Sequence, residues 1–239
     1  VDIKIVRQGS AAIREQFNSL QVSGFRHAIV DAINPADLMS IGEALKGMKL
    51  ITGGSGIALG LPENFRRTGG LSGNSDAILP LASGRSAVLA GSCSITTLSQ
   101  VAAAQRHWPN LSLDPCSFAD TPERGAKEAL AWVDKQPSDA PVLIYSSADP
   151  VVVAKVQKTL GRDKAGDLVE ETMGAIAQGL VDRGIRRLVV AGGETSGSVV
   201  TALGVTGLKI GPEIDPGVPW TETINEPHIA LALKSGNFG

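Results

Sequence analysis

The 239-residue sequence contains few of the residues that mark disulfide-rich or metal-binding proteins. Its two cysteines, Cys93 and Cys116, offer no disulfide framework and no metal-ligand spacing. Its three histidines lie far apart and adjoin no ligand pattern. We therefore expect reduced thiols, a cytoplasmic location and no metal site built from these residues.

The sequence also lacks an excess of one charge and long hydrophobic runs. The formal net charge is −2 and the pI is about 6.0, whereas binding to nucleic acid needs a concentrated basic surface. No apolar run approaches the roughly 18 residues of a membrane helix. We expect neither a nucleic acid nor a membrane as partner.

Short β-branched runs do alternate with helical patterns along most of the chain. This alternation predicts an α/β fold, with a mostly parallel sheet flanked by helices. The last strands follow one another without intervening helices, so we expect some antiparallel strands near the C-terminus. The expected strands are 27–33, 49–54, 87–92, 111–114, 141–147, 186–192, 208–211 and 228–236. The expected helices are 34–45, 95–107, 121–136, 150–160, 164–183 and 195–203.

The alternation lapses between about residues 61 and 85, which are rich in Gly, Pro and Ser. Such a stretch indicates a domain boundary or a functional loop. The chain also starts with Val1 rather than Met, and we expect it to be a piece of something longer.

Three strand-to-helix corners are rich in glycine or serine: "ITGGSGIALG", "LAGSCSITTL" and "VAGGETSGSVV". The terminal "LKSGNFG" leaves a strand in the same manner. Such corners bind ligands in open α/β sheets, and helix N-termini favour phosphate. No Walker motif is present, so the sequence does not predict a P-loop NTPase.

The third corner carries the most information. Gly192 and Gly193 would let the backbone approach a phosphate, while Thr195 and Ser196 could cap the helix or donate hydroxyls. Glu194 could orient Mg²⁺ or a water. A tight turn followed by a capped helix is the alternative interpretation.

The other two corners are more ambiguous. Ser92 and Ser94 suit a helix start, where capping alone would explain one of them. The first corner has a loose Rossmann-like spacing at Gly54, Gly56 and Gly60, but no strand with a ribose-binding acid follows it. Close helix packing explains these glycines equally well.

Taken in order, "TGGSGIALGLPENF", "VLAGSCS", "AGGETSG", "TGLKIGPEIDPGVPW" and "LALKSGNFG" resemble the four-carbon acid sugar kinase family. The combination is specific, although each motif alone is weak. The resemblance implies ATP-dependent phosphorylation of the terminal hydroxyl of a four-carbon sugar acid, such as 3-dehydro-tetronate, with Mg²⁺ as cofactor. The implied ATP-binding residues are Ser92, Gly192, Gly193, Glu194, Thr195, Ser196, Gly197 and Gly236.

Family members open with an acidic "DDFTG" stretch linked to the sugar acid, and these 239 residues lack it. The resemblance therefore implies the last portion of the sugar-binding N-terminal domain at 1–80 and a nucleotide-binding domain at 81–239. The catalytic base is not identified. Glu63, Asp76 and Asp215 are candidates by location, and Glu213 shares with Asp215 a Pro-rich loop that is either a site loop or a solvated bend.

Two other functions stay open. One is a nicotinamide-dependent oxidoreductase built on "GGSGIALG", and the other is a non-catalytic nucleotide-binding module. The sequence defines neither the stereoisomer of the sugar acid nor the oligomeric state, for which a homodimer is one option.

Overall fold

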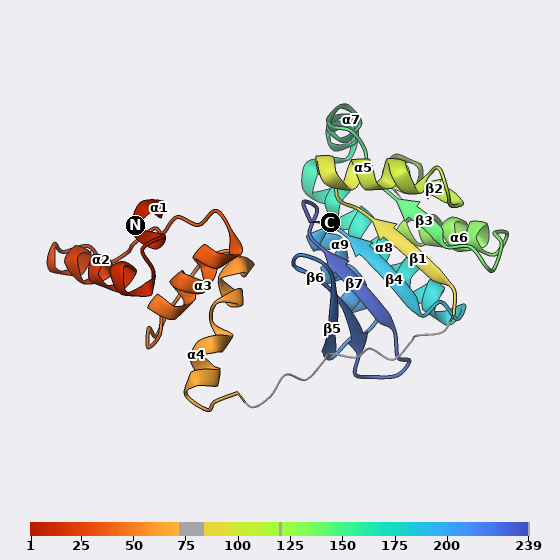
Figure 1. Cartoon of the computed structure of the whole chain (residues 1–239). Helices are drawn as coiled ribbons and strands as arrows, with labels where there is room; N and C mark the ends of the chain where they lie inside the picture. Colours follow the sequence, from red (N-terminus) through yellow and green to blue (C-terminus); the bar gives the residue numbers. More distant parts are fainter. Residues whose placement is uncertain (72–83, 120, 239) are drawn as a thin grey trace. The chain divides into compact units, whose positions relative to one another are not determined.

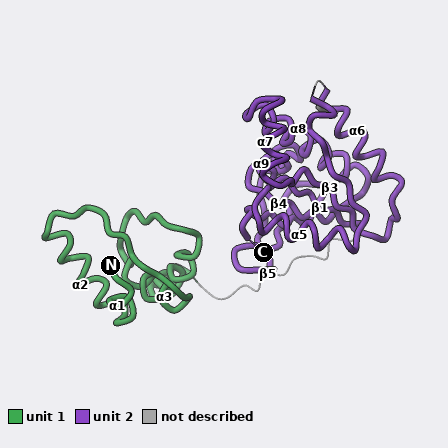
Figure 2. Tube along the Cα trace, turned by 90° about the horizontal axis from the view of Figure 1, so that it is seen from above, with its two compact units in different colours: residues 1–75 green, residues 76–239 purple. Residues whose placement is uncertain are grey.

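The computed structural model describes residues 1–71, 84–119 and 121–238. The chain divides into two compact units, Val1–Ser75 and Asp76–Gly239 (Figure 2). This division falls inside the stretch where the sequence pattern lapses. The boundary expected at residue 80 and the candidate base Asp76 both lie outside the described residues.

The first unit is helical in its described part (Figure 1). A small core joins its helices through Val6, Ile13, Ile41, Ala44 and Leu45. Its elements are α1 (Ile3–Val6), α2 (Ser10–Val22), α3 (Pro35–Ala44), the short 3-10 helix η1 (Ser55–Leu59) and α4 (Pro62–Arg67).

Helix α3 begins where the sequence predicts it. The Asn34 side chain accepts from the Asp37 amide at 3.1 Å, and the Asp37 carboxylate accepts from the Asn34 amide at 3.1 Å. This reciprocal capping satisfies two backbone donors at the helix start. Farther along α3, a Cβ on Gly42 would lie 2.3 Å from the carbonyl carbon of Gly60. At Gly60 the first glycine corner thus serves close packing rather than a Rossmann turn.

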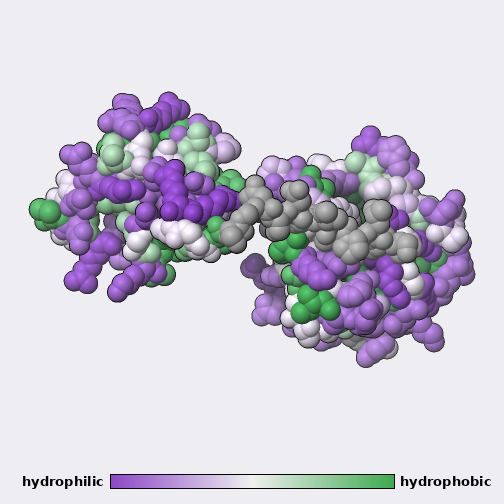
Figure 3. Space-filling view, turned by 60° about the horizontal axis from the view of Figure 1, so that its bottom comes forward, coloured by the Kyte–Doolittle hydropathy of each residue, from purple (hydrophilic) through white to green (hydrophobic). Residues whose placement is uncertain are grey.

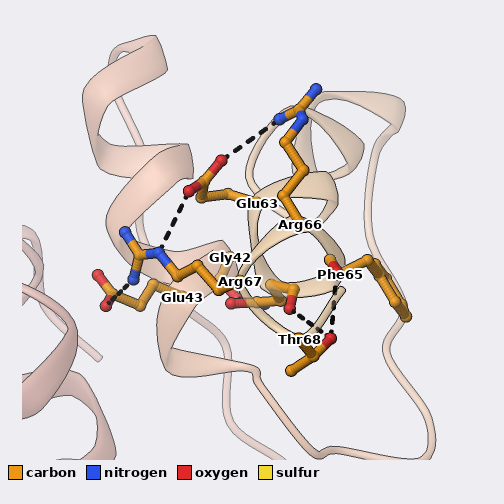
Figure 4. A network of polar contacts seen from close by, with 8 residues as sticks. Gly42, Glu43, Glu63, Phe65, Arg66, Arg67 and Thr68 are labelled. Carbon is orange, nitrogen blue, oxygen red and sulfur yellow. Dashed lines mark hydrogen bonds and ion pairs between the residues drawn. The ribbon is translucent and has the colours of Figure 1, made fainter. Parts of the chain in front are cut away.

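Helix α4 forms where we expected an irregular stretch. Pro62 starts the helix, and Glu63 pairs with Arg66 at 3.4 Å and with Arg67 at 3.2 Å, one turn away (Figure 4). Arg67 also reaches Glu43 of α3 at 2.6 Å, and its guanidinium holds the pKa of the Glu43 carboxyl below its ordinary value. Local ion pairs stabilise this helix in a sequence of weak periodicity.

The second unit is built on a seven-stranded sheet in the order β2-β3-β1-β4-β7-β6-β5. The first five strands in this order run parallel, and β6 pairs antiparallel with both β5 and β7. The expected fold class is confirmed. The strands are β1 (Ser86–Ala90), β2 (Asn110–Ser112), β3 (Val142–Tyr145), β4 (Arg187–Ala191), β5 (Leu208–Asp215), β6 (Val218–Thr223) and β7 (Ala230–Lys234).

Helices cover both faces of this sheet (Figure 1). On one face, α6, α8 and α9 pack together over Leu89, Ile144 and Leu188. On the other face, α5 lies over Ala90 and Leu143. The helices are α5 (Ile95–Ala104), α6 (Pro122–Val133), α7 (Pro150–Leu160), α8 (Arg162–Asp182) and α9 (Gly193–Ala202), with the short 3-10 helix η2 (Pro115–Phe118). None of the helices in the described part of the chain is long and apolar enough to cross a membrane.

Two sequence expectations are wrong. The Pro-rich loop expected at 212–220 is mostly the hairpin of β5 and β6. Proline is tolerated there because β5 is an edge strand, and the register shifts on both sides of Glu213. The strands expected at 27–33 and 49–54 do not form among the described residues, where no ladder partner lies beside them.

Candidate functional site

Three glycines lie just beyond the carboxyl ends of three neighbouring strands in the second unit. Gly91 follows β1, Gly192 follows β4, and Gly236 lies two residues after β7. The helix after β1 packs on one face of the sheet, and the helix after β4 packs on the other. Open α/β sheets bind ligands in the crevice that such a divergence creates.

Gly91 and Gly192 are required by the packing of the protein itself. A Cβ on Gly91 would lie 2.1 Å from the Thr195 hydroxyl oxygen, and one on Gly192 would lie 2.9 Å from the same atom. Gly192 also has a φ of +136°. Thr195 is buried in this contact, and it also lines the pocket beside α9.

Gly193 differs from both. A Cβ on Gly193 would meet no atom within 4 Å, and the residue is exposed at the first position of α9. The same open space surrounds Gly197, one turn later. The protein has no packing reason to keep a glycine at position 193, which leaves room for a ligand against the backbone.

No side chain caps the N-terminus of α9. Neither Thr195 nor Ser196 makes the cap that the alternative interpretation requires, and the Ser196 hydroxyl is buried without a partner among the described residues. The first-turn amides of a helix have no intrahelical acceptors and carry partial positive charge. This corner is therefore suited to an anion.

The N-terminus of α5 has the opposite character. Ser94 accepts from the Thr97 amide at 3.1 Å, so Ser94 is the one of the two candidate serines that caps the helix. The Ser94 hydroxyl also donates to the Gly236 carbonyl at 2.5 Å, and Thr97 donates to the same oxygen at 2.9 Å. Helix α5 thus binds the segment after β7 through these two hydrogen bonds. Because its N-terminus is capped, the N-terminus of α5 is less available to phosphate than the N-terminus of α9.

Lys234, at the end of β7, is a buried residue that sequence analysis missed. Its amine donates to Gln100 at 2.7 Å, to Thr97 at 3.3 Å and to the Gly236 carbonyl at 3.5 Å. Burial lowers the pKa of this lysine. Its position at the end of the apolar run "HIALALK" was the signal available in the sequence.

A pocket of about 310 Å³ adjoins the α9 corner. Valines of α7 and α8, including Val152 and Val169, form an apolar part of its lining, and Glu170 and Glu194 add carboxylates. Burial, with smaller contributions from Glu194 and Asp167, raises the pKa of Glu170. An apolar wall beside an anion-binding helix end is the combination that a nucleotide needs.

The carboxylates near the α9 corner fit Mg²⁺ only together with the phosphates of a bound ligand. No group of three or more His, Cys, Asp or Glu that could hold a metal occurs among the described residues. Mg²⁺ is commonly bound through one or two carboxylates plus substrate phosphates and waters. Glu194 and Glu170 could supply the carboxylates.

The other acidic candidates are dispersed. Glu213 accepts from the Gly217 amide at 2.6 Å and stabilises the β5–β6 turn. Asp215 is exposed at the carboxyl end of β5 in the same hairpin, at the side of the sheet where the parallel strands also end. Glu63 belongs to the first unit, where it is ion-paired.

The comparison with protein families finds two domains in the chain. Residues 87–239 match the nucleotide-binding C-terminal domain, and residues 1–61 match the sugar-binding N-terminal domain. The chain belongs to the four-carbon acid sugar kinase family.

Similar proteins of this kinase family are known from several bacteria. The 3-oxo-tetronate kinase of Burkholderia multivorans is 50% identical over 235 residues, which are 98% of this chain and 54% of that protein. The Salmonella typhimurium 3-oxo-tetronate kinase is 42% identical over 234 residues, covering 97% of this chain and 55% of that protein. The chain thus spans about half the length of the curated relatives it matches.

Two solved structures share the fold of this family member. A Salmonella typhimurium protein, described as a putative tRNA synthase, has a TM-score of 0.80 and 38% identity, covering 100% of this chain and 56% of that one. A Haemophilus influenzae protein has a TM-score of 0.70 and 36% identity, covering 100% and 57%.

Proposed function

We propose that the second unit binds Mg·ATP at the α9 corner, within a protein that phosphorylates the terminal hydroxyl of a four-carbon sugar acid. The expected reaction converts 3-dehydro-tetronate to its 4-phosphate. The observation that carries the proposal is the uncapped N-terminus of α9 beside Gly193, where the backbone is open to a ligand. The names of the relatives support the choice of substrate.

Phosphoryl transfer depends mainly on positioning and on neutralising charge. The amides of residues 193–195 would bind phosphate oxygens, and the buried Ser196 hydroxyl would gain a partner. Ser92 and Gly236 would line the neighbouring corner, held in place by Ser94. When bound, Mg·ATP supplies the phosphoryl group and an electrophilic metal ion.

We infer that the acceptor side of the reaction is incomplete within these 239 residues. Positioning an acceptor against a donor can supply about 7–11 kcal/mol of a reaction barrier. The acidic stretch that the family uses for the sugar acid is absent from this sequence. We propose that this chain by itself retains ATP affinity while sugar phosphorylation is lost or nearly lost.

Two measurements on the 239-residue chain test the proposal. Calorimetry with Mg·ATP should show binding. NAD should not compete with ATP, whereas the oxidoreductase alternative requires that NAD bind. ADP release with ATP and 3-dehydro-tetronate should be far slower than for the whole Burkholderia multivorans enzyme. A comparable rate would locate the acceptor site within this chain and make Asp215 or Asp76 the base. If a longer protein that contains this chain phosphorylates no four-carbon sugar acid, the result would favour a non-catalytic nucleotide-binding module.

We further propose a cytoplasmic protein that assembles as a homodimer. Sedimentation of a longer protein that contains this chain measures its oligomeric state directly.

A further inference from the structure

Lys234 is a charged residue in the interior of the second unit. The face of this unit that Figure 3 shows is mostly hydrophilic, whereas Lys234 is only 7% exposed. None of the ion pairs in the described part of the chain includes Lys234. A buried charge has to be satisfied by hydrogen bonds. The three donors of the ammonium match three neutral acceptors: the side chains of Gln100 and Thr97 and the Gly236 carbonyl.

Lys234 also joins the end of β7 to both neighbouring corners. Its ammonium binds Thr97 and Gln100 of α5. Its main-chain carbonyl accepts from the amide of Gly192, directly before α9, at 2.9 Å. The Gln100 side chain donates in turn to the Phe238 carbonyl at 3.4 Å. One residue therefore connects the start of α9, helix α5 and the loop that follows β7.

The direction of the peptide between Gly236 and Asn237 is set by this network. The Gly236 carbonyl accepts from Ser94 at 2.5 Å, from Thr97 at 2.9 Å and from Lys234 at 3.5 Å. The C=O and N–H groups of a trans peptide point to opposite sides, and this peptide is trans. The Asn237 amide thus points away from α5, and no hydrogen bond within the described residues uses it. This donor is left for a ligand.

We propose that Lys234 is a positioning residue for the nucleotide. Its ammonium fixes the peptide after Gly236 so that the Asn237 amide donates to the bound nucleotide, and its carbonyl fixes Gly192 at the α9 corner. This role rests on the proposed ATP site. Lys234 itself does not touch the ligand, because its three donors are already used within the protein.

Lys234→Met keeps the side chain long and removes its donors. Calorimetry on the 239-residue chain should show Mg·ATP binding weakened about tenfold or more, because the Gly236 carbonyl loses a charged donor. The matched control is Thr223→Val, which removes a buried hydroxyl at the opposite end of the sheet, where it accepts from the Ile229 amide at 3.0 Å. This control should lower the melting temperature and leave ATP affinity unchanged. If both variants lose affinity in proportion to melting temperature, Lys234 is merely structural and the proposal is wrong.

Combining Lys234→Met with Thr97→Val tests whether the lysine acts through the protein. Thr97 accepts from Lys234 and donates to the Gly236 carbonyl. The double variant should therefore lose little more ATP affinity than the weaker of the two single variants, since both changes break one network. Additive losses would mean that the ammonium contacts the nucleotide directly, and would overturn the positioning role.

Hydrogen exchange without ATP reports on the two loops independently of the proposed function. The amides of Gly192 and Phe238, both hydrogen-bonded in the structure, should exchange about tenfold faster in Lys234→Met and at the wild-type rate in Thr223→Val. Thr97→Val should give the same increase at Phe238, and it carries the test if Lys234→Met does not fold. Unchanged exchange, or wild-type ATP affinity in Lys234→Met, would refute the positioning role alone. A wild-type chain that binds no ATP would instead refute the proposed site.

Discussion

Gly236 and Ser92 lie so close together that a Cβ on the glycine would come within 2.2 Å of the serine hydroxyl oxygen. They belong to different loops, one after β1 and one after β7, and both are part of the proposed ATP site. The contact therefore joins the β1 and β7 corners through atoms that leave no space for a side chain.

Gly236→Ala should lower the free energy of unfolding by about 1–3 kcal/mol, because the new methyl group overlaps Ser92. Adding Ser92→Gly should recover much of this loss, which thermal melts of the single and double variants measure. ATP affinity should be lower in the double variant than in Ser92→Gly alone if Gly236 also meets the ligand. Full recovery of both properties would restrict Gly236 to a packing role.

Gly193→Val should weaken Mg·ATP binding at least tenfold, or about 1.4 kcal/mol, because the branched side chain blocks access to the α9 amides. The melting temperature should change by only a few degrees, since a Cβ at this position meets no protein atom within 4 Å. Calorimetry and circular dichroism check the two effects. Thr201→Val, exposed at the far end of the same helix, should leave both unchanged, and undiminished affinity of Gly193→Val would refute the site.

Lys234→Met should alter how stability depends on pH. Burial lowers the pKa of Lys234 below the 10.5 of an unfolded chain, so the folded state binds this proton more weakly than the unfolded state. The wild type should consequently gain stability relative to the variant as pH rises from the lowered pKa to 10.5. Denaturant titrations across this range, with the exposed Lys155→Met as a control for lost charge, measure the difference. A constant difference would contradict the buried charge.

Glu170→Gln should change the pH dependence of stability in the direction opposite to Lys234→Met. Burial raises the pKa of Glu170 above 4.5, so wild-type stability contributed by this group falls as pH rises from 4.5 through the raised value. The variant should be the more stable protein above that window, and its advantage should shrink as pH falls to 4.5. Melting curves between pH 4 and about 8 decide it.

Much of the second unit could be predicted from local pattern. Alternating β-branched and helical segments correctly indicated the parallel sheet, and a serine cap at the start of α5 was expected, although the sequence did not decide between Ser92 and Ser94. The helix expected at 34–45 also formed, as α3 of the first unit, where Asn34 and Asp37 cap each other. It misplaced the end of β5, because whether Pro212 is tolerated depends on an edge position in the sheet.

The sequence by itself determined the α/β class, the main helices and the glycine-rich corners, because these follow from spacing and from local backbone preferences. Only the tertiary structure decided which glycines the packing of the protein requires: a Cβ on Gly91 would overlap Thr195, whereas one on Gly193 would meet no atom within 4 Å. It also brought Lys234 to Thr97 and left residues 27–33 and 49–54 without a strand partner in the described part of the chain. These outcomes depend on contacts between residues far apart in the chain, and a local pattern carries no information about a partner that lies elsewhere.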